Sequence, residues 1–179
     1  MIYHSKYSKV WPKISKAQKA LDAVILQRSG KKHDEVIKEQ LLALVVEIAE
    51  QANETQPFKF WKQTKNIDRT KALEEYVDGI HFFASLGNVI GFDQYIYIKP
   101  IREEKETVEL YLSVVSELMT FHYIYTRALF DKKDLHMPFI RSLNVYLAIA
   151  ERYGYTVDEI LQAYAAKNEM NYDRQQTGY

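Results

Sequence analysis

The sequence of 179 residues has no cysteine, six glycines and four prolines. The missing cysteine excludes disulfides, thiolate zinc sites and cysteine nucleophiles. The longest uninterrupted apolar run is residues 41–46, whereas a membrane helix needs about 20 apolar residues. No basic stretch followed by an apolar block marks an export signal at the N-terminus. We therefore expect a cytoplasmic protein made of a single domain over residues 1–179.

Net charge is also lacking, because Lys plus Arg and Asp plus Glu both total 24. A neutral chain has no general attraction for nucleic acid, and none is expected as a partner. The charge is nevertheless uneven, since Asp22 is the one acid against eight cations in residues 1–32. Four of these cations, Lys9, Lys13, Lys16 and Lys19, recur at helical spacing. A helical module that binds nucleic acid or protein without catalysis is therefore kept as an alternative.

Apolar residues recur with a period of 3.6 over long stretches, which predicts an all-α protein. We expect six helices, over residues 12–28, 33–54, 70–89, 102–130, 138–152 and 156–170. Pro12 suits the first turn of a helix, and Ser29-Gly30 is a typical stop. Thr156-x-x-Glu159 is a capping box. Residues 93–99 alternate as a strand would, but a lone strand has no partner, so we predict a loop.

Two of these helices carry acid pairs beside apolar faces. Glu47 interrupts an otherwise apolar stretch over residues 41–49, and Glu50 lies beside it on the same helical face. On the next helix, Glu75 and Asp78 are also three residues apart and lead into an apolar run. A helix that is apolar nearly all round is buried, so we expect these carboxylates at or near the interior.

Burying carboxylates together costs several kcal/mol or raises their pKa values. Lysine or arginine partners, or a solvated edge, would relieve that cost. Divalent cations would also relieve it, and Mg²⁺ prefers carboxylate, water and phosphate oxygens. A di-iron carboxylate bundle requires Glu-x-x-His on two helices, and the sequence contains no such motif.

The acid pairs resemble the metal signature of the all-α nucleoside triphosphate pyrophosphohydrolases, the MazG and dimeric dUTPase superfamily. Three further segments resemble the dimeric dUTPases in particular. They are the loop 58–62 (FKFWK), the motif 78–83 (DGIHFF) and the tail, Lys167-Asn168-x-x-Asn171-x-x-Arg174-Gln175-x-x-Gly178-Tyr179. Gln18 resembles the glutamine of that family's first helix.

The resemblance implies a homodimer with a four-helix metal-binding core that hydrolyses dUTP, and also dUDP, to dUMP. Two or more Mg²⁺ ions, replaceable by Mn²⁺, would be held by Glu47, Glu50, Glu75 and Asp78. One acid must also activate the attacking water, with Glu50 as the first choice and Glu47 as the second. Cationic and C-terminal side chains would contact the phosphates: Lys59, Lys62, Lys167, Arg174 and Tyr179.

To recognise the base, the protein needs amide groups that hydrogen-bond to the edge of the base. It also needs apolar groups against which the base and the sugar pack. The candidates are Gln18, Trp61, His81, Phe82, Asn168 and Asn171. Because amides can rotate to read either pyrimidine, another pyrimidine nucleotide such as dCTP is the alternative substrate. The sequence departs from the family at Gly79, where an apolar residue is usual. Residues 92–135 carry no recognised motif, and we expect either a lineage-specific insert or contacts to a regulatory protein there.

Overall fold

The computed structural model describes residues 5–92, 97–100, 106–127 and 131–178. Within these ranges the chain is all-helical, as predicted, and none of the described residues forms a strand. Among these helices, none is long and apolar enough to cross a membrane. The α-helices are α1 (Lys6–Ser29), α2 (Ile37–Thr55), α3 (Arg69–Val89), α4 (Thr107–Tyr125), α5 (His136–Arg152) and α6 (Val157–Thr177).

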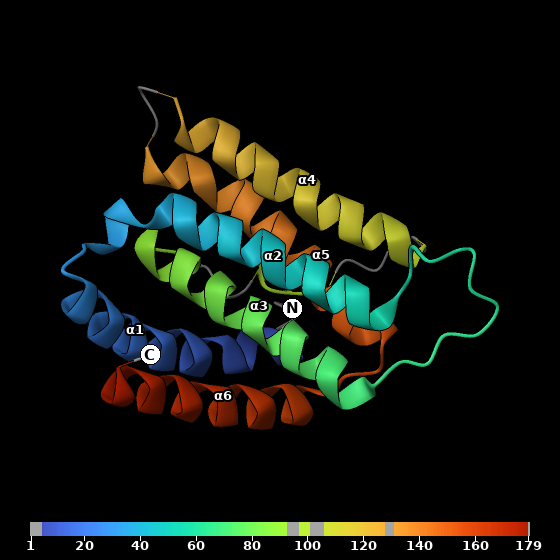
Figure 1. Cartoon of the computed structure of the whole chain (residues 1–179). Helices are drawn as coiled ribbons and strands as arrows, with labels where there is room; N and C mark the ends of the chain where they lie inside the picture. Colours follow the sequence, from blue (N-terminus) through green and yellow to red (C-terminus); the bar gives the residue numbers. More distant parts are fainter. Residues whose placement is uncertain (1–4, 93–96, 101–105, 128–130, 179) are drawn as a thin grey trace.

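Helix α3 lies at the centre of the molecule (Figure 1). It packs against α1, α2, α5 and α6. On one side, α4 pairs with α5 and touches α2, and on the opposite side α1 pairs with α6. Helices therefore surround most of α3, which explains why most residues from Ala72 to Val89 are buried, while its first turn and Glu74 stay exposed.

The core between α3 and α5 is aromatic. Tyr76 and Tyr146 stack with their ring centroids 4.5 Å apart, and the hydroxyl of Tyr146 donates to the carbonyl of Tyr76 at 2.9 Å. Two turns further on, Phe83 contacts both Tyr146 and Phe139. These rings are fully buried, so they fix how α3 sits on α5.

Several helix ends agree with the sequence. Gly30 closes α1 in the left-handed conformation, with φ of 66°. Thr156 and Glu159 form the predicted capping box at the start of α6. Asp68 caps α3 by accepting hydrogen bonds from the backbone of Thr70 and Lys71.

Other predicted boundaries were wrong. Helix α1 begins at Lys6, capped by Ser5, so Pro12 lies inside the helix rather than at its start. A 3₁₀ turn over His33–Glu35 precedes α2, which begins at Ile37 instead of residue 33. Helix α4 ends at Tyr125 and is shorter than residues 102–130, whereas α6 continues to Thr177. Residues 93–96, 101–105 and 128–130 lie outside the described residues, as does most of the predicted loop 93–99.

Helix α4 supplies most of what the structure describes within residues 92–135. One side of α4 enters the common core through fully buried Val114, Leu118 and Phe121. Its other side carries exposed apolar side chains, Leu112, Met119 and Tyr123. Exposed apolar residues also occur on α2, where Leu42 is 66% exposed. The apolar stretch around Glu47 is therefore not buried all round, contrary to our expectation.

Candidate active site

Three of the four predicted metal ligands meet between α2 and α3. Carboxylate oxygens of Glu47, Glu75 and Asp78 lie within 4.8 Å of one another. Glu47 comes from α2, while Glu75 and Asp78 lie one turn apart on α3. Glu50 is exposed and stands outside this group. We call Glu47, Glu75 and Asp78 the acid cluster.

The acid cluster holds more negative charge than its surroundings balance. Burial, followed by the charges of Asp78, Glu50 and Glu75, raises the pKa of Glu47 to about 7. Burial also raises the pKa of Glu75 and of Asp78. Carboxylates that resist ionisation in this way are suited to a cation that is bound and released.

This pKa shift predicts a change of stability with pH in the metal-free protein. Between pH 6.5 and 8 the folded protein still binds a proton at Glu47 that the unfolded chain has lost, so unfolding becomes easier as the pH rises. After allowance for screening by solvent, we expect a loss of about 0.5 kcal/mol over this range. The window begins at the ordinary histidine pKa of 6.5 because buried His81, whose pKa is lowered to about 3, acts in the opposite direction mainly below that pH. Denaturant melts in EDTA measure the slope, and a rise in stability over this window would contradict it.

Helix α6 brings cations to the acid cluster. The ammonium of Lys167 lies 2.5 Å from Oδ2 of Asp78, and both side chains are largely buried. The guanidinium of Arg174 is close enough to lower the pKa of Asp78 as well. Arg174 also donates to the amide oxygen of Asn171 at 3.4 Å. Lys167 and Arg174 stand two turns apart on one face of α6, as the tail motif predicts.

A cavity of about 420 Å³ opens beside the acid cluster, between α1, α2, α3 and α6. The side chains at 78, 81, 82 and 85 follow one face of α3 along it. Eight predicted site residues line it: Gln18, Glu47, Asp78, His81, Phe82, Lys167, Asn171 and Arg174. The structure thus brings predicted site residues from both ends of the sequence to one cavity.

Gln18 is the hub of a buried polar network in this cavity. Its amide oxygen accepts hydrogen bonds from Tyr164 at 2.9 Å and from Nδ1 of His81 at 2.7 Å. Because Nδ1 of His81 donates and burial keeps the ring neutral, Nε2 of His81 is an acceptor. His81 also stacks on Tyr164 with ring centroids 4.1 Å apart. The amide nitrogen of Gln18 donates to Asp22 at 2.8 Å.

Five polar residues of the cavity were not predicted from the sequence, namely Asp22, Ser29, Lys31, Gln40 and Ser85, and hydrogen bonds join Asp22, Gln40 and Ser85. Ser85 donates to Oδ2 of Asp22 at 2.8 Å, and its oxygen accepts from Gln40 at 2.7 Å. His33 lies 3.1 Å from the Ser85 hydroxyl and 3.6 Å from Asp22. A signal for Asp22 was present, because it is the lone acid of a basic segment and follows Gln18 by one helical turn. Gln40 and Ser85 carry no such signal.

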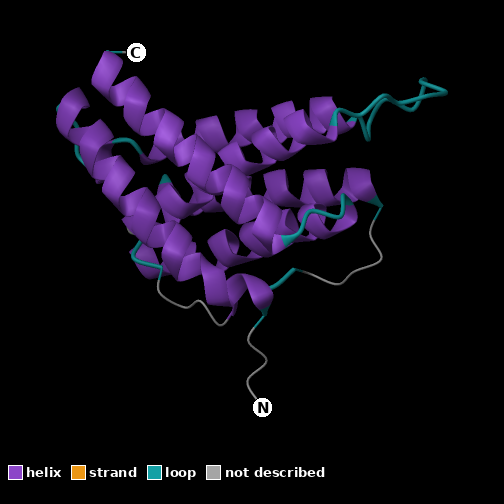
Figure 2. Ribbon diagram, turned by 90° about the horizontal axis from the view of Figure 1, so that it is seen from below, coloured by secondary structure: helices purple, strands orange, loops and turns teal. Residues whose placement is uncertain are grey.

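Some predicted residues do not line the cavity. Lys59, Trp61 and Lys62 lie in the loop 56–68, which projects away from the helices (Figure 2). The two lysines donate to side chains at the end of α2, and Trp61 is 62% exposed. Asn168 faces a separate groove between α1 and α6. Tyr179 lies outside the described residues.

Comparison with known proteins agrees with the motifs. A protein-family model described as dUTPase matches residues 10–179. The chain belongs to the all-α dUTPase family. A search of curated proteins found no match. The family match includes residues 92–135, so α4 lies within the matched region.

At Gly79, where the resemblance to the dUTPase family leads us to expect an apolar residue, the structure leaves no room for a side chain. A Cβ atom at position 79 would lie 2.3 Å from the hydroxyl oxygen of Tyr146. Gly79 is buried one residue after Asp78, so the close approach of Tyr146 to α3 occurs directly behind the acid cluster. Glycine is therefore tolerated within this helix, despite its low helix propensity, because the tyrosine needs the space.

Proposed function

We propose that this chain hydrolyses dUTP, and also dUDP, using Mg²⁺ held at the acid cluster. One observation carries the proposal: in a dUTPase family member, three clustered carboxylates and the two cations Lys167 and Arg174 lie beside one end of a cavity. The donor set suits Mg²⁺, which prefers carboxylate oxygens and completes its shell with water and phosphate. Mn²⁺ is expected to substitute, and two or more ions would balance the four acids, including Glu50. When bound, these ions would neutralise charge on the phosphate oxygens.

The protein groups around the cluster have separate tasks. Lys167 and Arg174 are placed to bind phosphate oxygens, the arginine through its planar fork. Glu50 stands outside the cluster and is free to accept a proton from the attacking water, with Glu47 as second choice. The water oxygen would bond to the β-phosphorus as the bond from that phosphorus to the α-phosphate oxygen breaks. The products would be dUMP and pyrophosphate.

The nucleoside would occupy the rest of the cavity. Asp78 and Ser85 lie seven residues apart on α3, about 10 Å along the helix axis. This length suits a nucleoside with its phosphates at Asp78 and its base near Ser85. Phe82 and His81 lie between these ends, where the sugar and base would pack. Gln18 and Asn171, which line the cavity, remain our candidates for reading uracil, whereas Asn168 faces the other groove.

Pyrophosphate release from a panel of Mg²⁺-nucleotides tests the proposed activity. We expect dUTP to be the best substrate. Glu50→Ala should lower kcat by about 10³-fold, because water activation and charge balance are lost together. Preferred turnover of dCTP would refute the choice of base, and an unimpaired Glu50→Ala enzyme would refute the role of Glu50. If the chain released no pyrophosphate and bound duplex nucleic acid in a salt-dependent way, the non-catalytic alternative would be favoured.

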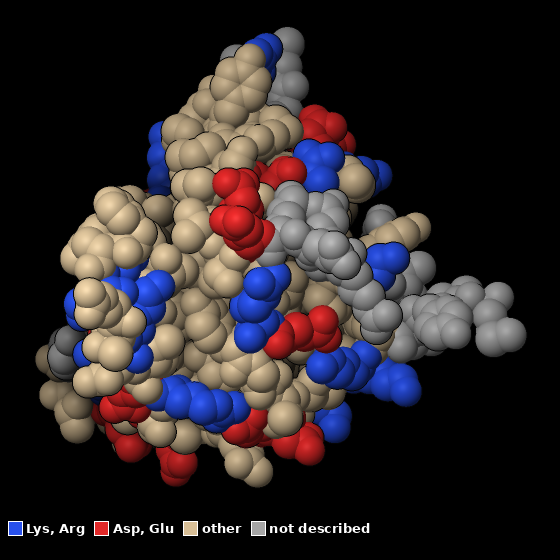
Figure 3. Space-filling view, turned by 90° about the vertical axis from the view of Figure 1, so that its right-hand side faces the viewer, with Lys and Arg blue, Asp and Glu red and all other residues tan. Residues whose placement is uncertain are grey.

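Charge on the molecular surface gives that alternative little support. Basic and acidic side chains are interspersed on the face shown in Figure 3, and the net charge of the chain is zero. Strong binding to nucleic acid usually requires a continuous basic surface. A small nucleotide held by a few local cations makes no such demand.

We also propose that two copies associate through α2 and α4. Exposed apolar residues line these adjacent helices: Leu42 and Val46 on α2, and Leu112, Met119 and Tyr123 on α4. Side chains of this kind on neighbouring helices are typical of an interface. A dimer would also give the loop 56–68, with its exposed Trp61, a second chain to contact.

Leu42→Glu should therefore convert the dimer to a monomer at micromolar concentration, because a charge would be buried in the interface. Met137→Glu is the matched control, since Met137 is 59% exposed and lies on α5, which is not one of the two helices of the proposed interface. Light scattering measures the mass of both. A monomeric wild-type protein would refute the dimer and leave this surface to a regulatory protein.

A further inference from the structure

The ion pair between Lys167 and Asp78 occupies the position where the proposed metal site needs a free carboxylate. Lys167 Nζ lies 2.5 Å from Oδ2 of Asp78, with the two side chains 24% and 15% exposed. The charge of this lysine lowers the pKa of Glu47, Glu75 and Asp78 alike. In the metal-free protein, one ammonium group therefore serves all three members of the acid cluster.

We infer that Lys167 is an internal counter-ion of the acid cluster, and that its transfer from Asp78 to a substrate phosphate makes metal binding depend on nucleotide binding. This inference rests on the proposed function. The tail motif assigns Lys167 to phosphate alone, and Asp78 is its second partner here. Lys167 is thus a positioning residue for the metal-free state as well as a phosphate ligand.

The side chain is suited to such an exchange. Lysine has a flexible four-carbon stem and three rotatable donors, whereas arginine binds in a fixed fork. The helix that carries Lys167 is held in place, because α6 packs on both α1 and α3. Tyr164, one turn earlier, is buried with its hydroxyl bonded to Gln18. The ammonium can therefore swing between neighbouring anions while its backbone stays fixed.

The energetic consequence is a positive coupling between metal and nucleotide. Without nucleotide, a metal ion can bind Oδ2 of Asp78 only after Lys167 has left it. No phosphate is then present to receive the ammonium, so the energy of the ion pair is lost. With nucleotide present, the same movement brings the ammonium to a phosphate, so the cost of the lost ion pair is recovered. By linkage, the nucleotide raises metal affinity by the same factor as the metal raises nucleotide affinity.

Mn²⁺ affinity in the absence of nucleotide tests this directly. Free Mn²⁺ is measured by electron paramagnetic resonance at pH 8, where the acid cluster is ionised. Lys167→Met should bind Mn²⁺ about tenfold more tightly than wild type, because a positive charge next to the site is removed. Lys167→Arg keeps the charge and should stay within about threefold of wild type. The control Lys6→Met removes another lysine–carboxylate pair, with Glu151 at 3.3 Å, and should leave Mn²⁺ affinity unchanged.

A second measurement adds a non-hydrolysable α,β-imido analogue of dUTP. The analogue should raise the Mn²⁺ affinity of wild type by a larger factor than that of Lys167→Met, because the variant has no ion pair to give up. If the methionine variant does not fold, as judged by circular dichroism, Lys167→Gln takes its place with the same expectation.

The outcomes separate this inference from the proposed function. Equal or weaker Mn²⁺ binding by the folded variant, with dUTP hydrolysis intact in wild type, would overturn the counter-ion role alone. A wild-type protein that neither binds Mn²⁺ nor hydrolyses dUTP would overturn the proposed function itself.

Discussion

Replacing Glu47 by glutamine is expected to lower dUTP hydrolysis by about 10³-fold while making the metal-free protein more stable. The loss follows because Glu47 is the one α2 member of the acid cluster, so its removal leaves the cation with ligands from α3 only. The gain follows because burial and three nearby acids oppose the charge of Glu47. At pH 8 in EDTA we expect a rise in Tm of about 3 °C, equivalent to about 1 kcal/mol. Steady-state kinetics and thermal melts measure both effects.

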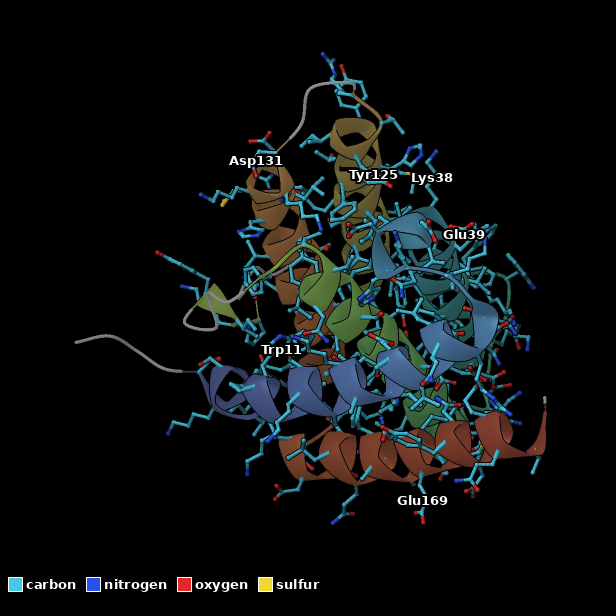
Figure 4. All side chains as sticks on the ribbon, turned by 90° about the vertical axis from the view of Figure 1, so that its left-hand side faces the viewer. Trp11, Lys38, Glu39, Tyr125, Asp131 and Glu169 are labelled. Carbon is cyan, nitrogen blue, oxygen red and sulfur yellow. The ribbon has the colours of Figure 1, made fainter. Side chains whose placement is uncertain are left out.

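Glu39→Gln provides the matched control on the same helix. Glu39 is exposed in the first turn of α2 (Figure 4) and lies outside the acid cluster. This variant should keep wild-type kcat and the wild-type response to EDTA. A Glu47→Gln protein that is inactive and also less stable would mean that the carboxylate is a structural group rather than a metal ligand.

Gly79→Ala is expected to destabilise the protein by about 2 kcal/mol, even though alanine favours helices. The new Cβ would lie 2.3 Å from the hydroxyl oxygen of Tyr146 and 2.8 Å from its ring. Tyr146 cannot withdraw easily, because it is fully buried and stacked on Tyr76. Urea melts measure the loss, which corresponds to a fall in Tm of about 6 °C.

A double variant identifies the cause. Tyr146→Phe removes the closest atom, so Gly79→Ala should cost less in that background than in wild type, and the interaction free energy follows from the cycle. Gly87→Ala tests the same helix where the nearest atom, of Phe139, lies 3.0 Å away, and it should cost less than Gly79→Ala. Equal costs in both tyrosine and phenylalanine backgrounds would show that the hydroxyl is not the obstacle.

The sequence predicts most of the helices because their signals are local. Periodicity places α3 within a residue or so of its observed bounds, and the capping box at Thr156 starts α6 where expected. The start of α1 was missed because Pro12 is a strong local signal for a first turn, whereas the observed helix continues through Pro12 and forgoes the backbone hydrogen bond that proline cannot donate. The 3₁₀ turn His33–Glu35 before α2 carries no apolar residue, so periodicity gives no signal that separates it from the helix.

The site was predictable where its residues follow a motif and not where they meet through packing. The three clustered acids and Lys167 come from repeated or motif spacings. Asp22, Gln40 and Ser85 come from three helices, and only the folded chain shows that they share a network. The place of Trp61 likewise depends on where its loop extends, which no local pattern encodes.

The pairing of α1 with α6 bears on how the chain folds during synthesis. The two helices run side by side in Figure 4, and Tyr164 of α6 bonds to the carbonyl of Ile14 and to Gln18. The ribosome therefore releases the first helix long before its neighbour exists. Until then, the part of α1 that packs on α6 stays uncovered on the nascent polypeptide, even where α3 already covers the rest, and chaperones or premature aggregation compete for it. We expect folding to complete only after release, with the cavity as the last region to form.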